Sequence, residues 1–206
     1  MKLLVTGFPR FDAFPENATE ALIESMRNDP PQEMADLDPI VSFDIVRFEN
    51  DNELVQQQTM LASLDALLEQ HQPHACLFCG QAASRPRIEL EMLAINVFKG
   101  RLIDPSGPPA YWSTLPKTKD LLDAIRQAEI PAALSYYAGT HLCNHILYTA
   151  LRRAEQTESG MQCGFVHLPM TATQVIRADE NRPFVPLAFT RQALMLAIRH
   201  LVDHTA

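Results

Sequence analysis

The chain has 206 residues, of which 47% are hydrophobic and 20% are charged, a balance typical of a folded globular protein. Its 17 basic and 25 acidic side chains give a net charge of −8, which argues against nucleic acid and anionic membranes as partners. The 4 cysteines are too few for a disulfide scaffold, and no apolar stretch approaches the roughly 20 residues of a membrane span, so we expect a cytoplasmic protein with one domain over residues 1–206.

The first part of the chain alternates short apolar runs with longer segments of helical periodicity. Strands are expected at residues 3–6, 40–48 and 74–80, and helices at residues 19–26 and 52–70. Asn17 or Thr19 is expected to cap the first helix, because a short side-chain oxygen accepts an unpaired backbone N–H at that position. The glycine and prolines between the first strand and this helix predict a loop.

The second part continues this alternation after an apolar stretch at residues 87–97. A loop rich in proline and aromatic residues follows at residues 105–116, and we expect it to act as a lid. Further helices are expected at residues 117–128, 142–154 and 186–202, and extended segments at residues 132–136 and 162–168. This order predicts an α/β fold, a three-layer sandwich with helices on both faces of a largely parallel or mixed central sheet.

Cofactor and metal motifs are weak in this sequence. The 7 glycines never fall in the spacing of a dinucleotide or triphosphate loop, which argues against nucleotide-dependent chemistry. Cys76 and Cys79 have the spacing of half a zinc site, but residues three apart on a strand point to opposite faces and cannot converge on one ion. We therefore predict no cofactor and no metal.

Three residues have the properties of a thiol hydrolase site. Cys143 follows a glycine-containing turn at the expected start of a helix, where unpaired N–H groups and the helix dipole would lower the pKa of a thiol and hold an oxyanion. His167 ends a buried strand, and Glu91 is a carboxylate in an apolar setting that needs a buried partner. The ordinary alternative for each is a core residue: a small buried thiol for Cys143 and a hydrogen-bonded imidazole for His167.

Two motifs in the first half of the chain resemble those of a known enzyme family, the pyrrolidone carboxyl peptidases, also called pyroglutamyl peptidase I. The family opens with T-G-F-x-P-F-G-G and N-P-S, and this chain has T-G-F-P-R-F-D-A at residues 6–13 and N-A-T at residues 17–19. The family's G-Q-A-G-G-R and P-E-R-V-A-I-N resemble G-Q-A-A-S-R at residues 80–85 and L-E-M-L-A-I-N at residues 90–96.

Two further motifs carry the same resemblance in the second half. The family's A-G-T-x-x-C-N-H resembles residues 138–145 without a gap, and its G-F-x-H-x-P resembles residues 164–169. The four motifs occur in the family's order over residues 3–174. By this resemblance Cys143 is the nucleophile, His167 the base and Glu91 the carboxylate that orients it.

The chain departs from the family pattern in several places. Pro9 comes one place early, Asp12 and Ala13 replace a glycine pair, Ala83 and Ser84 replace another, Met92 replaces an arginine, and Ala18 replaces a proline. Glycine permits backbone conformations that other residues resist. We therefore expect an altered first loop around the substrate ring and an unaltered catalytic trio.

The resemblance implies a cysteine peptidase that removes an N-terminal pyroglutamate (5-oxoproline) from peptides. It favours Arg101 over Arg85 as the cation at the oxyanion, and it matches Asp104 to a family acid of unassigned role. The remaining implied roles belong to the substrate ring: Phe8 and Phe11 clamp it, while Asn17 and the backbone near Gln81 bind its lactam N–H and C=O. The partners would be peptides that begin with pyroglutamate, and self-association into a homo-oligomer is a further expectation of the resemblance.

Two other functions remain as alternatives. One is a relative without catalysis, or with altered specificity, that keeps the fold and binds a pyroglutamyl-like ligand, which the altered first loop would favour. The other is an enzyme on a phosphorylase-like α/β fold with a different amide or glycosidic substrate. Retention of Cys143, His167 and Glu91 together argues against both, because a relative that has lost or changed this activity has no chemical reason to keep all three.

Overall fold

The computed structural model describes residues 1–11, 16–37, 40–179 and 181–205. The expected alternation of strands and helices is confirmed. The strands of the described chain are β1 (Leu3–Gly7), β2 (Val41–Ile45), β3 (Ala75–Gln81), β4 (Ile88–Glu91), β5 (Leu93–Ile95), β6 (Ala110–Trp112), β7 (Ala132–Ser135) and β8 (Gln162–Leu168). The helices are α1 (Ala18–Asn28), α2 (Glu53–His71), α3 (Thr118–Gln127), α4 (Leu142–Gln156), α5 (Ala172–Ala178) and α6 (Leu187–His204), with a 3-10 turn η1 (Gln32–Met34).

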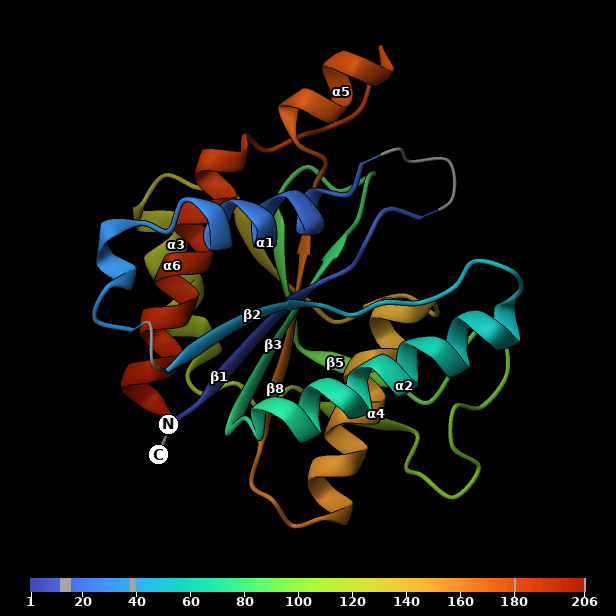
Figure 1. The fold of residues 1–206 in the computed structure, drawn as a ribbon. Coiled ribbons are helices and arrows are strands. Elements are labelled where there is room, and N and C mark those ends of the chain that lie inside the picture. The colour runs from blue at the N-terminus through green and yellow to red at the C-terminus, as the bar shows by residue number, and fades with distance from the viewer. Residues whose placement is uncertain (12–15, 38–39, 180, 206) are drawn as a thin grey trace.

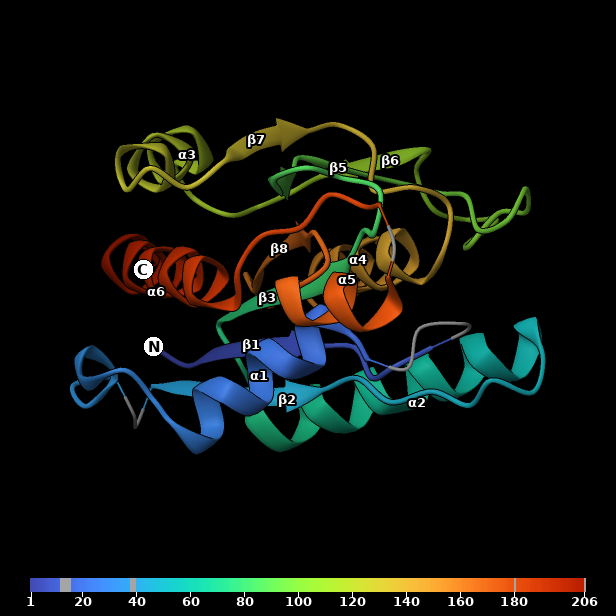
Figure 2. The same ribbon diagram turned by 90° about the horizontal axis from the view of Figure 1, so that it is seen from above.

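The central sheet has the strand order β2-β1-β3-β8-β4-β7. Strands β2, β1, β3 and β8 run parallel, and β4 runs antiparallel to β8 but parallel to β7. The sheet is therefore mixed. The segment expected as one apolar stretch at residues 87–97 divides after Glu91: β4 joins this sheet, while β5 pairs with β6 in a small second sheet beside α4 (Figure 2).

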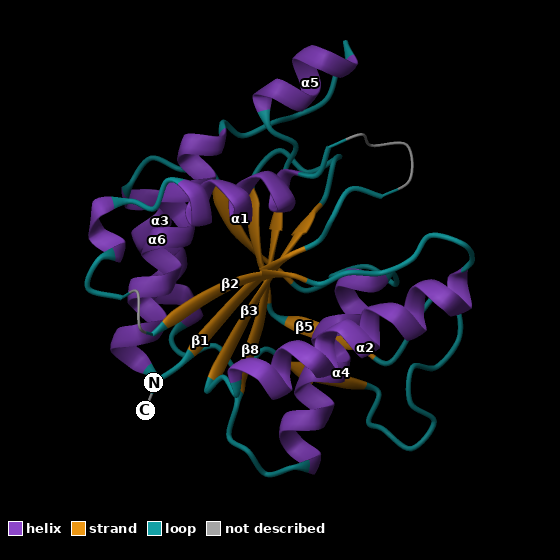
Figure 3. Ribbon diagram, viewed as in Figure 1, coloured by secondary structure: helices purple, strands orange, loops and turns teal. Residues whose placement is uncertain are grey.

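Helices cover both faces of the sheet, as the three-layer prediction requires. Helices α1, α3 and α6 lie on one side, and α2 and α4 lie on the other (Figures 1 and 3). Because side chains alternate along a strand, each face has its own apolar core. Cys76 belongs to the core under α2 and α4, and Cys79 belongs to the core under α1, α3 and α6, so the two thiols point to opposite faces as predicted.

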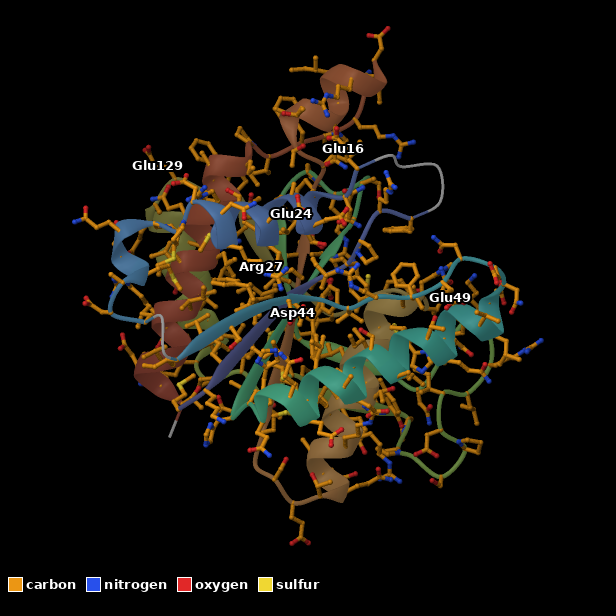
Figure 4. The ribbon with its side chains drawn as sticks, viewed as in Figure 1. Glu16, Glu24, Arg27, Asp44, Glu49 and Glu129 are labelled. Atoms are coloured by element: carbon orange, nitrogen blue, oxygen red, sulfur yellow. The ribbon has the colours of Figure 1, made fainter. Side chains whose placement is uncertain are left out.

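Polar side chains at the ends of elements fix several of these helices. Asn17 caps α1 by accepting the Thr19 N–H at 2.8 Å, and Asn52 caps α2 by accepting the N–H groups of Leu54 and Val55. Arg27 reaches from α1 to Asp44 on β2 with an N–O distance of 3.0 Å (Figure 4). Within the described chain, none of the helices is long and apolar enough to cross a membrane.

The proline-rich segment, expected to act as a lid, is bonded to α4 in this structure. It contains β6, and the Tyr148 hydroxyl of α4 donates to the Pro108 carbonyl at 2.7 Å. Asn96 accepts the Asp104 N–H at 2.9 Å, and the Asp104 carboxylate accepts from Arg152 of α4 at 3.0 Å. These contacts hold the first part of the segment against α4, and Ser113 and Thr114 hold its last part against the Cys163 carbonyl of β8.

Candidate active site

Cys143 lies in the first turn of α4, as predicted from its sequence context. Gly139 has a φ of 86°, a left-handed conformation that favours glycine, and His141 then enters the helix in an extended conformation. The first bond of the helix runs from the His145 N–H to the His141 carbonyl at 3.0 Å. The N–H groups of Leu142, Cys143 and Asn144 therefore have no partner within the helix, and the Cys143 N–H lies close enough to its own sulfur to favour the thiolate.

The residue after the nucleophile candidate anchors this helix end. The Asn144 side chain accepts the Ile95 N–H at 2.8 Å and donates to the carbonyls of Ile95 and Val97, each at 2.9 Å. Asn144 is fully buried, so these bonds are not exchanged with water. The position of Cys143 is thus fixed against β5, a strand nearly fifty residues away in sequence.

Gly80 allows the thiol to approach the sheet. A Cβ atom at this position would lie 2.9 Å from the Cys143 Sγ and 2.5 Å from the Phe165 Cζ. Gly80 is also the strand partner of His167 in the parallel register of β3 and β8. Because Gly80 has no side chain, the sulfur can lie over the backbone of β3 at the residue that is paired with His167, on a strand about 4.8 Å away.

His167 and Glu91 form a buried pair. The His167 Nδ1 lies 2.6 Å from the Glu91 Oε1, and both side chains are at most 5% exposed. Burial alone raises the pKa of Glu91, but hydrogen bonds from His167 and Ser135 and the charges of His167 and Arg85 hold it below its ordinary value. Because Nδ1 is engaged by the carboxylate, Nε2 is the ring nitrogen left for proton transfer.

The predicted low pKa of Cys143 is not what the structure shows. Burial raises the pKa of the thiol to about 12, and the charge of Glu91 adds to this effect. The charge of Arg85 and the backbone N–H of Cys143 act in the opposite direction but are weaker. Burial also lowers the pKa of His167, so the resting pair is a neutral thiol beside a neutral imidazole.

This protonation state leads to a spectroscopic prediction. Thiolate absorbance that belongs to Cys143 should be absent between about pH 5 and 9, because its pKa lies well above this range. The measurement is the ultraviolet pH titration of the native protein minus that of Cys143→Ser, which removes the signals of the other cysteines. A step of one thiolate near neutral pH would contradict it.

A pocket of about 120 Å³ opens beside Cys143, and we call it the aromatic pocket. No acidic residue is among the described residues around it. Phe8 forms part of its wall, with its ring centre 6.1 Å from that of Phe48 and 6.4 Å from that of Phe165. The lining residues are Phe8, Phe11, Phe48, Gln56, Gln81, Lys99, His141, Leu142 and Cys143.

Gln81 presents an unused donor in this pocket. Its Oε1 accepts from the Ala18 N–H at 2.6 Å and from the Gln174 Nε2 at 2.8 Å. Its Nε2 is buried and has no hydrogen-bond partner in the part of the chain that the structure describes. An unpaired buried amide is unfavourable by about 1–3 kcal/mol, so this group is suited to a ligand acceptor.

Asn17 lies outside the lining of the aromatic pocket. Its Oδ1 caps α1, and its Nδ2 donates to the Pro9 carbonyl at 3.1 Å. Both ends of the Asn17 side chain therefore bond to the first loop and the start of α1. The contact of Asn17 with the substrate ring stays a prediction. The replaced glycine pair at Asp12 and Ala13 lies outside the described residues.

The two candidate arginines have different surroundings. Arg85 donates to Glu91, whereas Arg101 is exposed in the loop after β5, and its guanidinium makes no hydrogen bond or ion pair with any described residue. Arg101 as the oxyanion cation stays a prediction. Asp104 accepts from Ser106 and Arg152, which lower its pKa to about 2, so the structure gives this acid an anchoring contact with α4.

Several residues of the site had no signal in the sequence. Phe48 follows β2 and Lys99 follows β5, in loops that reach the aromatic pocket only after folding. Gln174 orients Gln81 from α5, which stands where β8 ends (Figure 1). Helix α5 itself was not predicted, although Thr171 and Gln174 form a capping box that the residue pattern T-x-x-Q could have indicated.

Comparisons with known proteins identify the family of the chain. The family model described as pyroglutamyl peptidase matches residues 1–204. A pyrrolidone-carboxylate peptidase of Thermococcus kodakarensis is 33% identical, with 98% of this chain and 97% of the relative covered. The crystal structure of pyroglutamyl peptidase I from Bacillus amyloliquefaciens is 27% identical, with 99% of this chain and 96% of that chain covered and a TM-score of 0.82.

A mutant pyrrolidone carboxyl peptidase from Pyrococcus furiosus shares the fold over 100% of both chains, with a TM-score of 0.83 at 24% identity. The match to the family model over nearly the whole chain, together with a relative at 33% identity, is sufficient to assign the family. This chain belongs to the pyroglutamyl peptidase family of cysteine peptidases.

Proposed function

We propose that this protein hydrolyses the amide bond that follows an N-terminal pyroglutamate in peptides, with Cys143 as nucleophile, His167 as general acid and base, and Glu91 as the group that orients the imidazole. The observation that carries the proposal is the buried contact of 2.6 Å between His167 Nδ1 and Glu91 Oε1, beside a strand end where Gly80 admits the Cys143 sulfur. A partly exposed thiol at the pocket wall, together with a buried imidazole and carboxylate, matches the needs of acyl transfer.

The proton balance follows from the neutral resting pair. As the Cys143 sulfur bonds to the carbonyl carbon, its proton passes to the His167 Nε2, and the imidazolium then protonates the leaving amine. Water next attacks the thioester while His167 takes a proton from it, and collapse of that intermediate releases pyroglutamate and returns the thiol. The unpaired N–H groups at the start of α4 support the oxyanion, with Arg101 as its proposed cation.

The aromatic pocket suits the pyroglutamyl ring. The lactam is neutral, and a wall of Phe8, Phe11 and Phe48, with no acidic residue among the described lining residues, favours a neutral ring over an ammonium group. The unpaired Gln81 Nε2 is the proposed donor to the lactam carbonyl. Asn17 supports the ring by holding the Pro9 end of the first loop.

The cellular compartment and the partners of the protein are proposed from its chemistry. All 4 cysteines are free in the structure, which is consistent with a reducing compartment such as the cytoplasm. The partners are then peptides whose N-terminus has cyclised to pyroglutamate. Self-association is proposed only from the resemblance to the family.

A substrate comparison tests the function. The native protein is expected to release a fluorescent amine from its pyroglutamyl amide at pH 7 under reducing conditions and to leave the matched prolyl amide intact. Proline has the same ring size but lacks the lactam carbonyl and carries a charged nitrogen, so it loses the Gln81 contact and meets an apolar wall. Equal rates on the two amides, or no release from either by folded protein, would overturn the proposal.

A further inference from the structure

The Arg85 guanidinium contacts the proposed catalytic carboxylate, Glu91, although Arg85 is not one of the three proposed catalytic residues. Arg85 lies in the loop between β3 and β4, and its Nη1 donates to the Glu91 Oε1 at 2.5 Å. This is the oxygen that also contacts the His167 Nδ1. The other nitrogen, Nη2, donates to the Tyr137 carbonyl at 2.9 Å, in the segment that leads from β7 into α4.

Glu89 holds this guanidinium from the other side. Its carboxylate forms ion pairs with both Arg85 and Arg87, and its side chain is 13% exposed. Glu89 is the antiparallel partner of His167, two residues before Glu91, so both carboxylates project on the same face of β4 beside the imidazole. A buried and a partly buried carboxylate so close together would repel each other, and the Arg85 guanidinium between them offsets that repulsion.

The Arg85–Glu91 ion pair is largely shielded from solvent. The Arg85 side chain is 21% exposed and that of Glu91 is fully buried. A buried ion pair loses hydration on both partners, and removing one of them leaves an uncompensated charge. The catalytic carboxylate therefore depends on Arg85 as well as on His167.

We propose that Arg85 is a positioning residue of the peptidase, whose guanidinium, fixed by Glu89, keeps Glu91 ionised and aimed at the His167 Nδ1. This role rests on the proposed function. It is distinct from an oxyanion role, because the guanidinium is occupied by Glu89, Glu91 and the Tyr137 carbonyl.

The charges around His167 make the role measurable as a pH dependence. The charged groups that act on it are Glu89 and Glu91 from β4 and Arg85 from the preceding loop. The positive charge of Arg85 lowers the pKa of His167, and the negative charge of Glu89 raises it. Loss of the Arg85 charge should move the acid limb of kcat/KM to higher pH, and loss of the Glu89 charge should move it to lower pH.

The test uses Arg85→Gln, Arg85→Lys and Glu89→Gln, with Arg87→Gln as the matched control because Arg87 is half exposed and does not contact Glu91. Arg85→Gln should lower kcat on a pyroglutamyl amide by about 10- to 100-fold with little change in KM, since misaligned catalytic groups lose rates of this order. Its acid limb should rise by about one pH unit. Arg85→Lys keeps the charge and should recover the native pH profile with part of the rate, and Arg87→Gln should stay within about 2-fold of the native rate.

The outcomes separate this role from the function itself. A native protein that hydrolyses no pyroglutamyl amide overturns the proposed function and, with it, the role of Arg85. An active native protein whose Arg85→Gln form behaves like Arg87→Gln, or loses only substrate affinity with an unmoved pH profile, overturns the positioning role alone. If circular dichroism shows that Arg85→Gln does not fold, the other two variants test the role. An acid limb of kcat/KM that moves to lower pH in Glu89→Gln, together with a native pH profile in Arg85→Lys, supports it. An unmoved pH profile in Glu89→Gln overturns it.

Discussion

Replacing Cys143 by serine should lower the hydrolysis of a pyroglutamyl amide by about 10⁴-fold or more, because loss of a nucleophile removes the covalent step that the other groups serve. Serine keeps the size of the side chain, and its hydroxyl fits the space above Gly80 that the sulfur occupies. The hydroxyl proton is held more tightly than a thiol proton, so His167 cannot generate an effective nucleophile from it at neutral pH. The measurement is the single-turnover and steady-state rate of amine release under reducing conditions.

Cys163→Ala is the control for this substitution. Cys163 is fully buried on β8 and faces Cys76 across the strand pair, so it does not line the aromatic pocket. This variant should keep the native rate within about 3-fold, although removing a buried sulfur lowers stability by about 1 kcal/mol. The serine variant should still bind the product pyroglutamate, since the ring contacts are unchanged. A serine variant with a tenth of the native rate would exclude Cys143 as the nucleophile.

Replacing Glu91 by glutamine should reduce kcat by about 10³-fold, because a neutral amide neither fixes the imidazole tautomer nor stabilises the imidazolium that forms during the reaction. The same change leaves the partly buried Arg85 without a carboxylate on one side. We expect the free energy of unfolding at pH 7 to fall by about 3 kcal/mol, as in other broken buried pairs. Rate measurements and urea unfolding on the same preparations check both effects.

The stability part of this prediction has a definite pH dependence. The pKa of Glu91 in the folded protein lies below its ordinary value of 4.5, so its contribution to stability is present above that pH and is lost as the pH falls through the folded-state pKa. The stability difference between native protein and Glu91→Gln should therefore shrink towards about pH 3. A difference that is constant from pH 7 to pH 3, or a kcat within about 5-fold of native, would show that Glu91 is not the orienting carboxylate.

Much of the fold was predictable because long elements carry their own periodicity. Strand β8 has the bounds expected from its apolar run, and α4 begins at the expected residue, Leu142. Strands β5 and β6 have only three residues each, too few for an alternating pattern, and their pairing is set by a partner distant in sequence. The division of residues 87–97 after Glu91 follows from that pairing and not from the local sequence.

The catalytic candidates were predictable from motifs, but their electrostatics were not. The helix terminus and the burial of Cys143 act on its pKa in opposite directions, and only the folded arrangement shows that burial is the larger effect. From the sequence alone, Arg85 would be interpreted as a solvent-exposed cation in a loop. In the structure its side chain lies between Glu89 and Glu91. The local sequence does not predict this contact, because the position of Glu89 and Glu91 beside His167 depends on the register of β4 against β8.

The protonated resting state of Cys143 also affects how long the enzyme survives chemically. Peroxides and related oxidants attack the thiolate form, and susceptibility follows thiolate character and exposure. A thiol with a pKa of about 12 is almost entirely protonated at neutral pH, so very little thiolate is available to such oxidants while no substrate is bound. The nucleophile becomes reactive only when His167 accepts its proton during attack on a bound carbonyl, so the protonated thiol of the idle site resists oxidation to sulfenic and sulfinic acid.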